Sequence, residues 1–242
     1  MATEVSEATP SEPISIARCQ NCGASATSNF CPNCGQSTKI AIPTLFGFLQ
    51  EAFGAIFSYD HKLWRTLWVL VAHPGQLTVD YAEGKRIRYL TPFQLFFWLQ
   101  AITFLSYHLF FNAEAGASDR MSRALLIIGA FIAVMFALIH VRRRMRFLLH
   151  LVASIHIWTF LMLLLLVEYA VTPTVATLLH RLHVIQGPLY TGPFVTYSAE
   201  VIMAVYTTLV IRKVYANPLW KAALKTLLLL AGYLLFVKYV PL

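Results

Sequence analysis

The chain has 242 residues, of which 58% are hydrophobic and only 12% are charged. Soluble domains carry about 25% charged residues, so this composition argues against an ordinary soluble domain and for a chain whose main solvent is lipid. The net charge of +8 does not indicate nucleic acid, because most cations lie beside apolar runs, as in membrane proteins. We therefore expect no nucleic-acid partner.

The four cysteines of the chain form two CxxC pairs that follow a predicted disordered tail. The tail, residues 1–17, is rich in Ser, Thr, Pro and Glu and shows no signal-peptide pattern. The cysteines are Cys19, Cys22, Cys31 and Cys34, and a glycine follows each pair. Four thiolates at this spacing predict a closed structural Zn²⁺ site in a small ribbon over residues 18–39.

The alternatives to zinc are a disulfide framework, an iron centre and a redox pair. Disulfides need an oxidising compartment, whereas the topology predicted below places the ribbon in the cytosol. A thioredoxin-type motif needs a surrounding βαβ unit, which this sequence does not indicate. The ribbon has almost no core of its own, so we expect zinc binding and folding to be coupled. It serves either as a folding staple alone or as a docking module for a protein partner.

Residues 43–91 predict interfacial amphipathic helices followed by a basic segment. The first helix covers residues 43–57, and the second runs from about Lys62 to Ala72 with Trp64 and Trp68 on its apolar face. Both are too short to cross a bilayer. The sequence His73-Pro74-Gly75 then ends the second helix. These helices either lie in the membrane interface or pack on the transmembrane bundle.

A basic run stands directly before the first apolar span. It contains Lys85, Arg86 and Arg88, and Tyr81 and Tyr89 flank it. It is not a phosphate loop, because the required first glycine and the Ser/Thr after the lysine are both missing. The run predicts either a positive-inside anchor or a binding site for an anionic lipid headgroup or a phosphorylated ligand.

The ribbon and the basic run together resemble the bacterial multi-pass membrane proteins of unknown function that carry an N-terminal zinc ribbon. The matching features are CxNCG…FCxNCGQ from Cys19 to Gln36, the region around Asp60, Pro74-Gly75, and Gly84-Lys85-Arg86-x-Arg88-Tyr89-x-x-Pro92. The resemblance is weaker after Phe111, where His150-Leu151-Val152-x-Ser154-x-His156 matches in part. It implies a ribbon joined to a membrane domain and supplies no catalytic residues.

Residues 92–242 predict a transmembrane helical bundle of about five spans. About 20 apolar residues cross the hydrocarbon core. The candidates are Pro92–Phe111, Ala124–Val141, Phe147–Val171, Pro193–Ile211 and Trp220–Val240, the last interrupted by lysines. The fold class expected is therefore an all-α membrane protein with a small N-terminal zinc ribbon and interfacial helices.

The basic residues at the ends of the spans predict the orientation. Eleven cations flank one side: Lys85, Arg86, Arg88, Arg142, Arg143, Arg144, Arg146, Arg212, Lys213, Lys221 and Lys225. Four flank the other: Arg120, Arg123, Arg181 and Lys238. This bias predicts a multi-pass protein of the bacterial inner membrane with its N-terminus in the cytosol and its C-terminus in the periplasm.

Four ionisable residues fall inside the predicted spans: His108, His156, Glu168 and Glu200. Such groups are costly in the bilayer and often functional, so they form a possible intramembrane site. The alternative is that the residues near the span ends simply reach water at the interface. His156 lies near the middle of its span, and the other three fall toward the outer side. His156 and Glu200 fit the interfacial alternative least well.

Three functions fit these features. The favoured one is a membrane adaptor, assembly factor or regulatory protein that presents its ribbon to a cytosolic partner. The others are a small transporter or channel that uses the intramembrane His and Glu residues, and a lipid-handling enzyme at the inner interface. No Ser/His/Asp triad, HExxH helix or nucleotide fingerprint indicates an enzyme. The sequence does not predict an oligomeric state.

Overall fold

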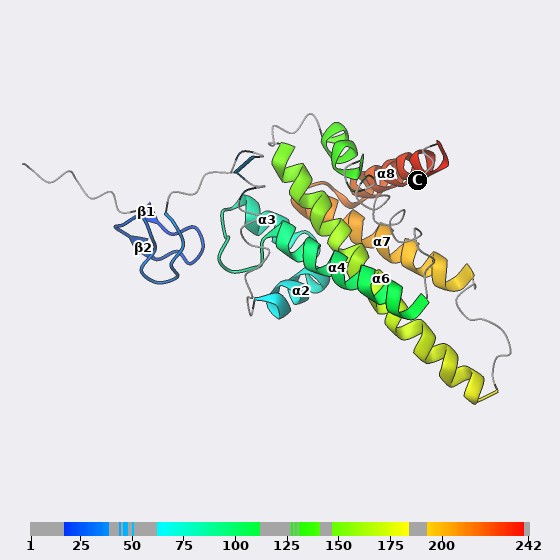
Figure 1. Cartoon of the computed structure of the whole chain (residues 1–242). Coiled ribbons are helices and arrows are strands. Elements are labelled where there is room, and N and C mark those ends of the chain that lie inside the picture. The colour runs from blue at the N-terminus through cyan, green and yellow to red at the C-terminus, as the bar shows by residue number, and fades with distance from the viewer. Residues whose placement is uncertain are drawn as a thin grey trace, which may run out of the picture.

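The fold comes from a computed structural model, shown in Figure 1. It describes residues 17–38, 44, 46–47, 50, 62–111, 127, 129, 131–140, 147–183 and 193–239. The elements are β1 (Ala17–Arg18), β2 (Ser25–Ala26), α2 (Leu63–Ala72), α3 (Gln76–Ala82), α4 (Pro92–Phe111), α6 (Phe147–Arg181), α7 (Pro193–Val214) and α8 (Leu219–Tyr239). Residues 131–139 are also helical. Most of the first predicted interfacial helix, residues 43–57, lies outside the described residues.

The described chain is mostly helical, as the sequence predicts. Two windows, Phe147–Glu168 in α6 and Leu219–Phe236 in α8, are long and apolar enough to cross a membrane. α6 is longer than the span predicted to end at Val171, because the helix continues through Pro173 to Arg181. Proline is tolerated in apolar helices where neighbouring groups satisfy the freed carbonyl. The bundle of five spans stays a prediction.

The longest helices pack side by side, and α2 and α3 lie across one end of this bundle (Figure 1). α4 packs along α6, α7 packs on both α6 and α8, and α3 contacts α6 and α7. Their shared core includes Leu95, Phe136, Met162 and Val210, each with no exposed surface. The two-stranded sheet of β1 and β2 belongs to the cysteine ribbon at the N-terminal side.

The two faces of α2 have different surroundings. Thr66, Val69 and Leu70 are buried against the bundle. Trp64 and Trp68, on the other face, are 78% and 68% exposed. The Tyr206 hydroxyl of α7 donates a 2.9 Å hydrogen bond to the Leu70 carbonyl and so ties the end of α2 to the bundle. One face of α2 therefore packs on the helical bundle, and the other face exposes the two tryptophans.

Gly75 allows the turn between α2 and α3 to lie against α7. It has a φ of +83° and stands at the N-terminus of α3, a conformation that favours glycine. A Cβ at this position would lie 3.3 Å from the Val210 Cα, the Lys213 Cβ and a Val214 methyl group. Both the left-handed backbone conformation and the close approach of α7 thus favour glycine here.

We predict that Gly75→Ala lowers the thermal unfolding temperature of the detergent-purified protein. Backbone strain of this kind costs about 1–3 kcal/mol, and the shift of α7 adds to it. Gly129→Ala is the matched control, because Gly129 is helical and its Cβ would meet Trp158 at an ordinary 3.8 Å. Equal unfolding temperatures for the two variants would contradict this role of Gly75.

Candidate metal centre

The two CxxC pairs fold as two copies of one turn. In the first, the Cys19 N–H donates to the Ala24 carbonyl at 2.9 Å and the Gly23 N–H donates to the Cys19 carbonyl at 2.8 Å. In the second, the Cys31 N–H donates to the Gln36 carbonyl and the Gly35 N–H to the Cys31 carbonyl, both at 2.8 Å. Gly23 and Gly35 have φ values of +76° and +72°. Glycine closes each turn because its backbone is left-handed there.

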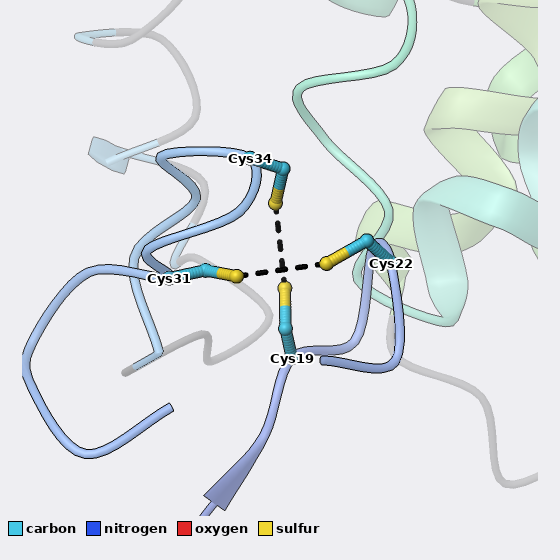
Figure 2. Close-up of side chains that lie close together, drawn as sticks. All are labelled: Cys19, Cys22, Cys31 and Cys34. Carbon is cyan, nitrogen blue, oxygen red and sulfur yellow. Dashed lines mark hydrogen bonds between the residues drawn. The ribbon is translucent and has the colours of Figure 1, made fainter. Parts of the chain in front are cut away.

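These turns bring the four cysteine sulfurs together, as Figure 2 shows. All four Sγ atoms lie within 4.8 Å of one another. The Cys19 and Cys34 sulfurs are 3.6 Å apart, and the Cys22 and Cys31 sulfurs are 3.5 Å apart. Tetrahedral zinc with Zn–S bonds of about 2.3 Å needs S···S separations of about 3.8 Å. The sulfur cluster therefore fits a metal ion of this size, and Cys19, Cys22, Cys31 and Cys34 would hold it.

The electrostatics of the cluster favour partial ionisation before any metal binds. A hydrogen bond from the Ala24 backbone lowers the pKa of Cys22 to about 6. The Gln36 backbone likewise lowers the pKa of Cys34. Burial raises the pKa of Cys31 to about 11. A bound cation would favour the thiolate of Cys31 despite its burial, because metal ligation deprotonates a coordinating thiol.

The Gln36 side chain joins the cysteine ribbon to the helical bundle. Its Nε2 donates to the Gly84 carbonyl at 2.9 Å. Its Oε1 accepts from the backbone N–H of Arg86 at 3.0 Å and of Ile87 at 3.3 Å. Gln36 is only 2% exposed, so these bonds satisfy a buried amide. We call this set of contacts the Gln36 clamp.

Lys85 of the basic run is held by two carboxylates. Its Nζ lies 2.9 Å from Asp80 Oδ1 and 2.6 Å from Glu83 Oε2. Burial would raise the pKa of Asp80, but hydrogen bonds from Lys85 and Gln76 outweigh it and lower that pKa. The bonds to Glu83 and Asp80 raise the pKa of Lys85. Lys85 thus belongs to a group of ion pairs at the end of α3.

The two arginines of the run differ in exposure. The guanidinium carbon of Arg86 lies 4.4 Å from the centre of the Tyr81 ring, and its Nη1 donates to the Tyr81 hydroxyl at 3.2 Å. Arg88 is exposed, and its guanidinium carbon lies 5.7 Å from the centre of the Tyr89 ring. Cation–π contacts of this kind contribute about 0.5–2 kcal/mol. Arg88 therefore presents its charge to the surroundings most openly.

The structure places His156 and Glu200 in different cavities. His156 is buried, and its Nδ1 lies 2.8 Å from the Thr78 hydroxyl of α3. It lines a small cavity of about 20 Å³ with Lys85 and Arg86. Glu200 is exposed at a larger cavity between α6, α7 and α8. Glu168 is half-buried on α6 and lines neither cavity, and the side chain of His108 lies outside the described residues.

Sequence reasoning missed two polar features. The first is the contact of Gln36: this residue closes the FCxNCGQ motif, where the first turn has Ala24, but nothing in the motif indicates which groups its amide meets. The second joins His140, His150 and Tyr215. The Tyr215 hydroxyl lies 2.8 Å from His150 Nδ1, and the His140 ring stacks on Tyr215 at 3.6 Å. No spacing in the sequence indicates this contact, because the three residues lie on helical segments that are far apart along the chain.

Comparison with known families gives one match. A family model described as "Protein of unknown function (DUF3667)" matches residues 60–104. This stretch contains α2, α3, the loop that receives the Gln36 clamp and the first part of α4. The cysteine ribbon lies outside the matched residues. Curated proteins and solved structures gave no match.

We predict that the purified protein carries about one zinc ion per chain. Cys22→Ser should lose it and make residues 18–39 sensitive to protease, because the metal supplies the core that the ribbon lacks. Thr27→Ser is the control, since Thr27 is an exposed ribbon residue that is not a ligand. Metal analysis and limited proteolysis of the three proteins check this. A metal-free but protease-resistant wild-type ribbon would contradict it.

Proposed function

We propose that this chain is an integral membrane adaptor or regulatory protein whose zinc ribbon is a docking module held on the membrane domain by the Gln36 clamp. The clamp is the observation that supports this proposal most directly. It fixes one side of the ribbon against the loop at residues 84–87. A ribbon fixed in this way can pass the binding of a partner on to the helices.

The exposed apolar surface supports the membrane part of the proposal. Only 11% of the apolar window of α8, Leu219–Phe236, is buried inside the structure. Large side chains of α4 and α7, such as Trp98 and Val201, are also exposed. Soluble monomers rarely expose contiguous apolar areas of more than a few hundred Å². We propose that lipid covers these exposed apolar side chains and that the helices form a transmembrane bundle of about five spans.

The proposed orientation follows from the positive-inside bias of the sequence. In this orientation the protein lies in the inner membrane, with its N-terminus and ribbon in the cytosol and its C-terminus in the periplasm. The cytosolic location keeps the four cysteines in a reducing compartment, where zinc-bound thiolates persist. We propose zinc as the metal because four clustered thiolates in a cytosolic segment suit it best.

The partner face that we propose is the side of the second turn that carries Phe30. Phe30 is 62% exposed, yet its backbone is tightly held. The Ser28 hydroxyl donates to the Phe30 carbonyl at 2.7 Å, and Phe30 pairs with Ser37 in a β-bridge. The Thr38 hydroxyl donates to the Ser28 carbonyl at 2.9 Å. An exposed aromatic ring on a rigid backbone is a typical anchor of protein interfaces.

The basic run is the second contact that we propose, to anionic lipid at the inner surface. Arg88 offers its charge most openly, and Arg86 lies beside it. Lys85 contributes less, because Asp80 and Glu83 hold it. Each basic residue near an anionic surface adds about 1 kcal/mol of attraction. The run would thus set the height of the ribbon above the membrane.

We predict that a photo-crosslinking residue at Phe30, introduced in living cells, yields one discrete protein adduct. The adduct should disappear in Cys22→Ser, which unfolds the ribbon, and persist in Thr27→Ser. A crosslinking residue at the exposed Trp64 of α2 is the positional control and should give lipid adducts instead. If Phe30 gives no protein adduct while zinc stays bound, the docking role is wrong.

A further inference from the structure

An apolar cavity lies between α6, α7, α8 and the helical residues 131–139. Its volume is about 230 Å³, larger than the ~150 Å³ apolar cavity that takes up benzene. Ile157, Leu161, Met203 and Leu229 represent its mostly apolar lining. A space of this size with an apolar lining can hold an apolar ligand.

The polar side chains of α7 and α8 in the lining lie toward the two ends of the cavity, and Trp158 of α6 also lines it. Thr226 lies at one end, where the Thr208 hydroxyl donates to its Oγ1 at 2.9 Å and joins α7 to α8. Glu200 and Tyr233 lie at the other end. At 1.5 Å per residue, Glu200 lies about 12 Å from Thr208 along α7, and Tyr233 lies about 10 Å from Thr226 along α8. Among the described residues that line the cavity, Glu200 alone is charged, and it is exposed.

The helices around the mouth are open on their outer sides. Val201 of α7 and Leu234 of α8 are 61% and 57% exposed, and Leu234 also lines the cavity. An alkyl chain can therefore enter from the surrounding hydrocarbon without crossing a polar barrier. A carboxylate at the rim attracts a cationic headgroup and repels an anionic one.

We propose that this cavity binds one alkyl chain of a membrane amphiphile whose ammonium headgroup pairs with Glu200. The chain lies between Ile157, Met203 and Leu229, and the Thr208–Thr226 contact closes the inner end. The proposal rests on the proposed membrane location and not on the docking role of the ribbon.

The test uses the full chain in vesicles with two diazirine-labelled probes of equal chain length, a long-chain amine and the corresponding alcohol. We expect the amine to label the cavity residues Met203 and Tyr233 several-fold more strongly than the alcohol does. Glu200→Gln should remove this preference. Loss of the preference in Glu200→Gln with labelling intact supports the headgroup contact, and an unchanged preference overturns it.

Ala204→Leu tests the cavity itself, because Ala204 lines it. This variant should lose labelling by both probes, whereas Ala231→Leu, at an exposed position of α8 outside the cavity, should keep it. Vesicle flotation and thermal unfolding verify that each variant is inserted and folded. Equal labelling of both variants would overturn the cavity proposal. Failure of the wild type to float with vesicles would instead overturn the membrane location.

Discussion

The Gln36 amide is the contact on which the relation between the ribbon and the helices depends. One side chain pairs with three backbone groups of the loop at residues 84–87. Each such bond is worth about 1 kcal/mol net, and a buried amide left without its partners costs more. Because Gln36 follows directly on the second cysteine turn, a metal bound by the four cysteines would also hold the amide in place. The loop ends at Leu90, whose N–H bonds to the Thr66 hydroxyl of α2 at 3.1 Å, so the ribbon is connected to the bundle core.

Local sequence patterns predicted three features of the structure: the cysteine cluster, the mostly helical chain and the break after α2. The spacing of Cys19, Cys22, Cys31 and Cys34 predicted their cluster, because two turns closed by glycine leave the sulfurs few other positions. Long apolar runs predicted a mostly helical chain, and Pro74-Gly75 predicted the break between helices. α3 was missed because its seven residues are too few for a clear period. The Gln36 clamp and the contacts of His140, His150 and Tyr215 were missed because they join segments that are distant in sequence.

The polar residues inside the apolar helices show the same limit. Depth in a span can be counted from the sequence, but the neighbours of a side chain depend on how the helices pack. His156 meets Thr78 of α3, and Glu200 faces a separate apolar cavity. The neighbours of such a polar group thus decide what it can do. His156 contacts Thr78 and so joins α6 to α3. Glu200 places a carboxylate at the edge of a mostly apolar cavity. The basic run is similar, since Asp80 and Glu83 pair with Lys85, whereas Arg88 is exposed.

Hydrogen exchange at the backbone amides of Arg86 and Ile87 tests most directly whether the metal-bound ribbon controls the loop through Gln36. In the zinc-loaded protein we expect slow exchange at both amides. Removal of zinc by a chelator, or Gln36→Met at constant zinc content, should make both exchange faster. The Leu90 amide, which bonds to Thr66, should stay unchanged and serves as the internal reference. Slow exchange at Arg86 and Ile87 after zinc removal, with the ribbon unfolded, would contradict the account.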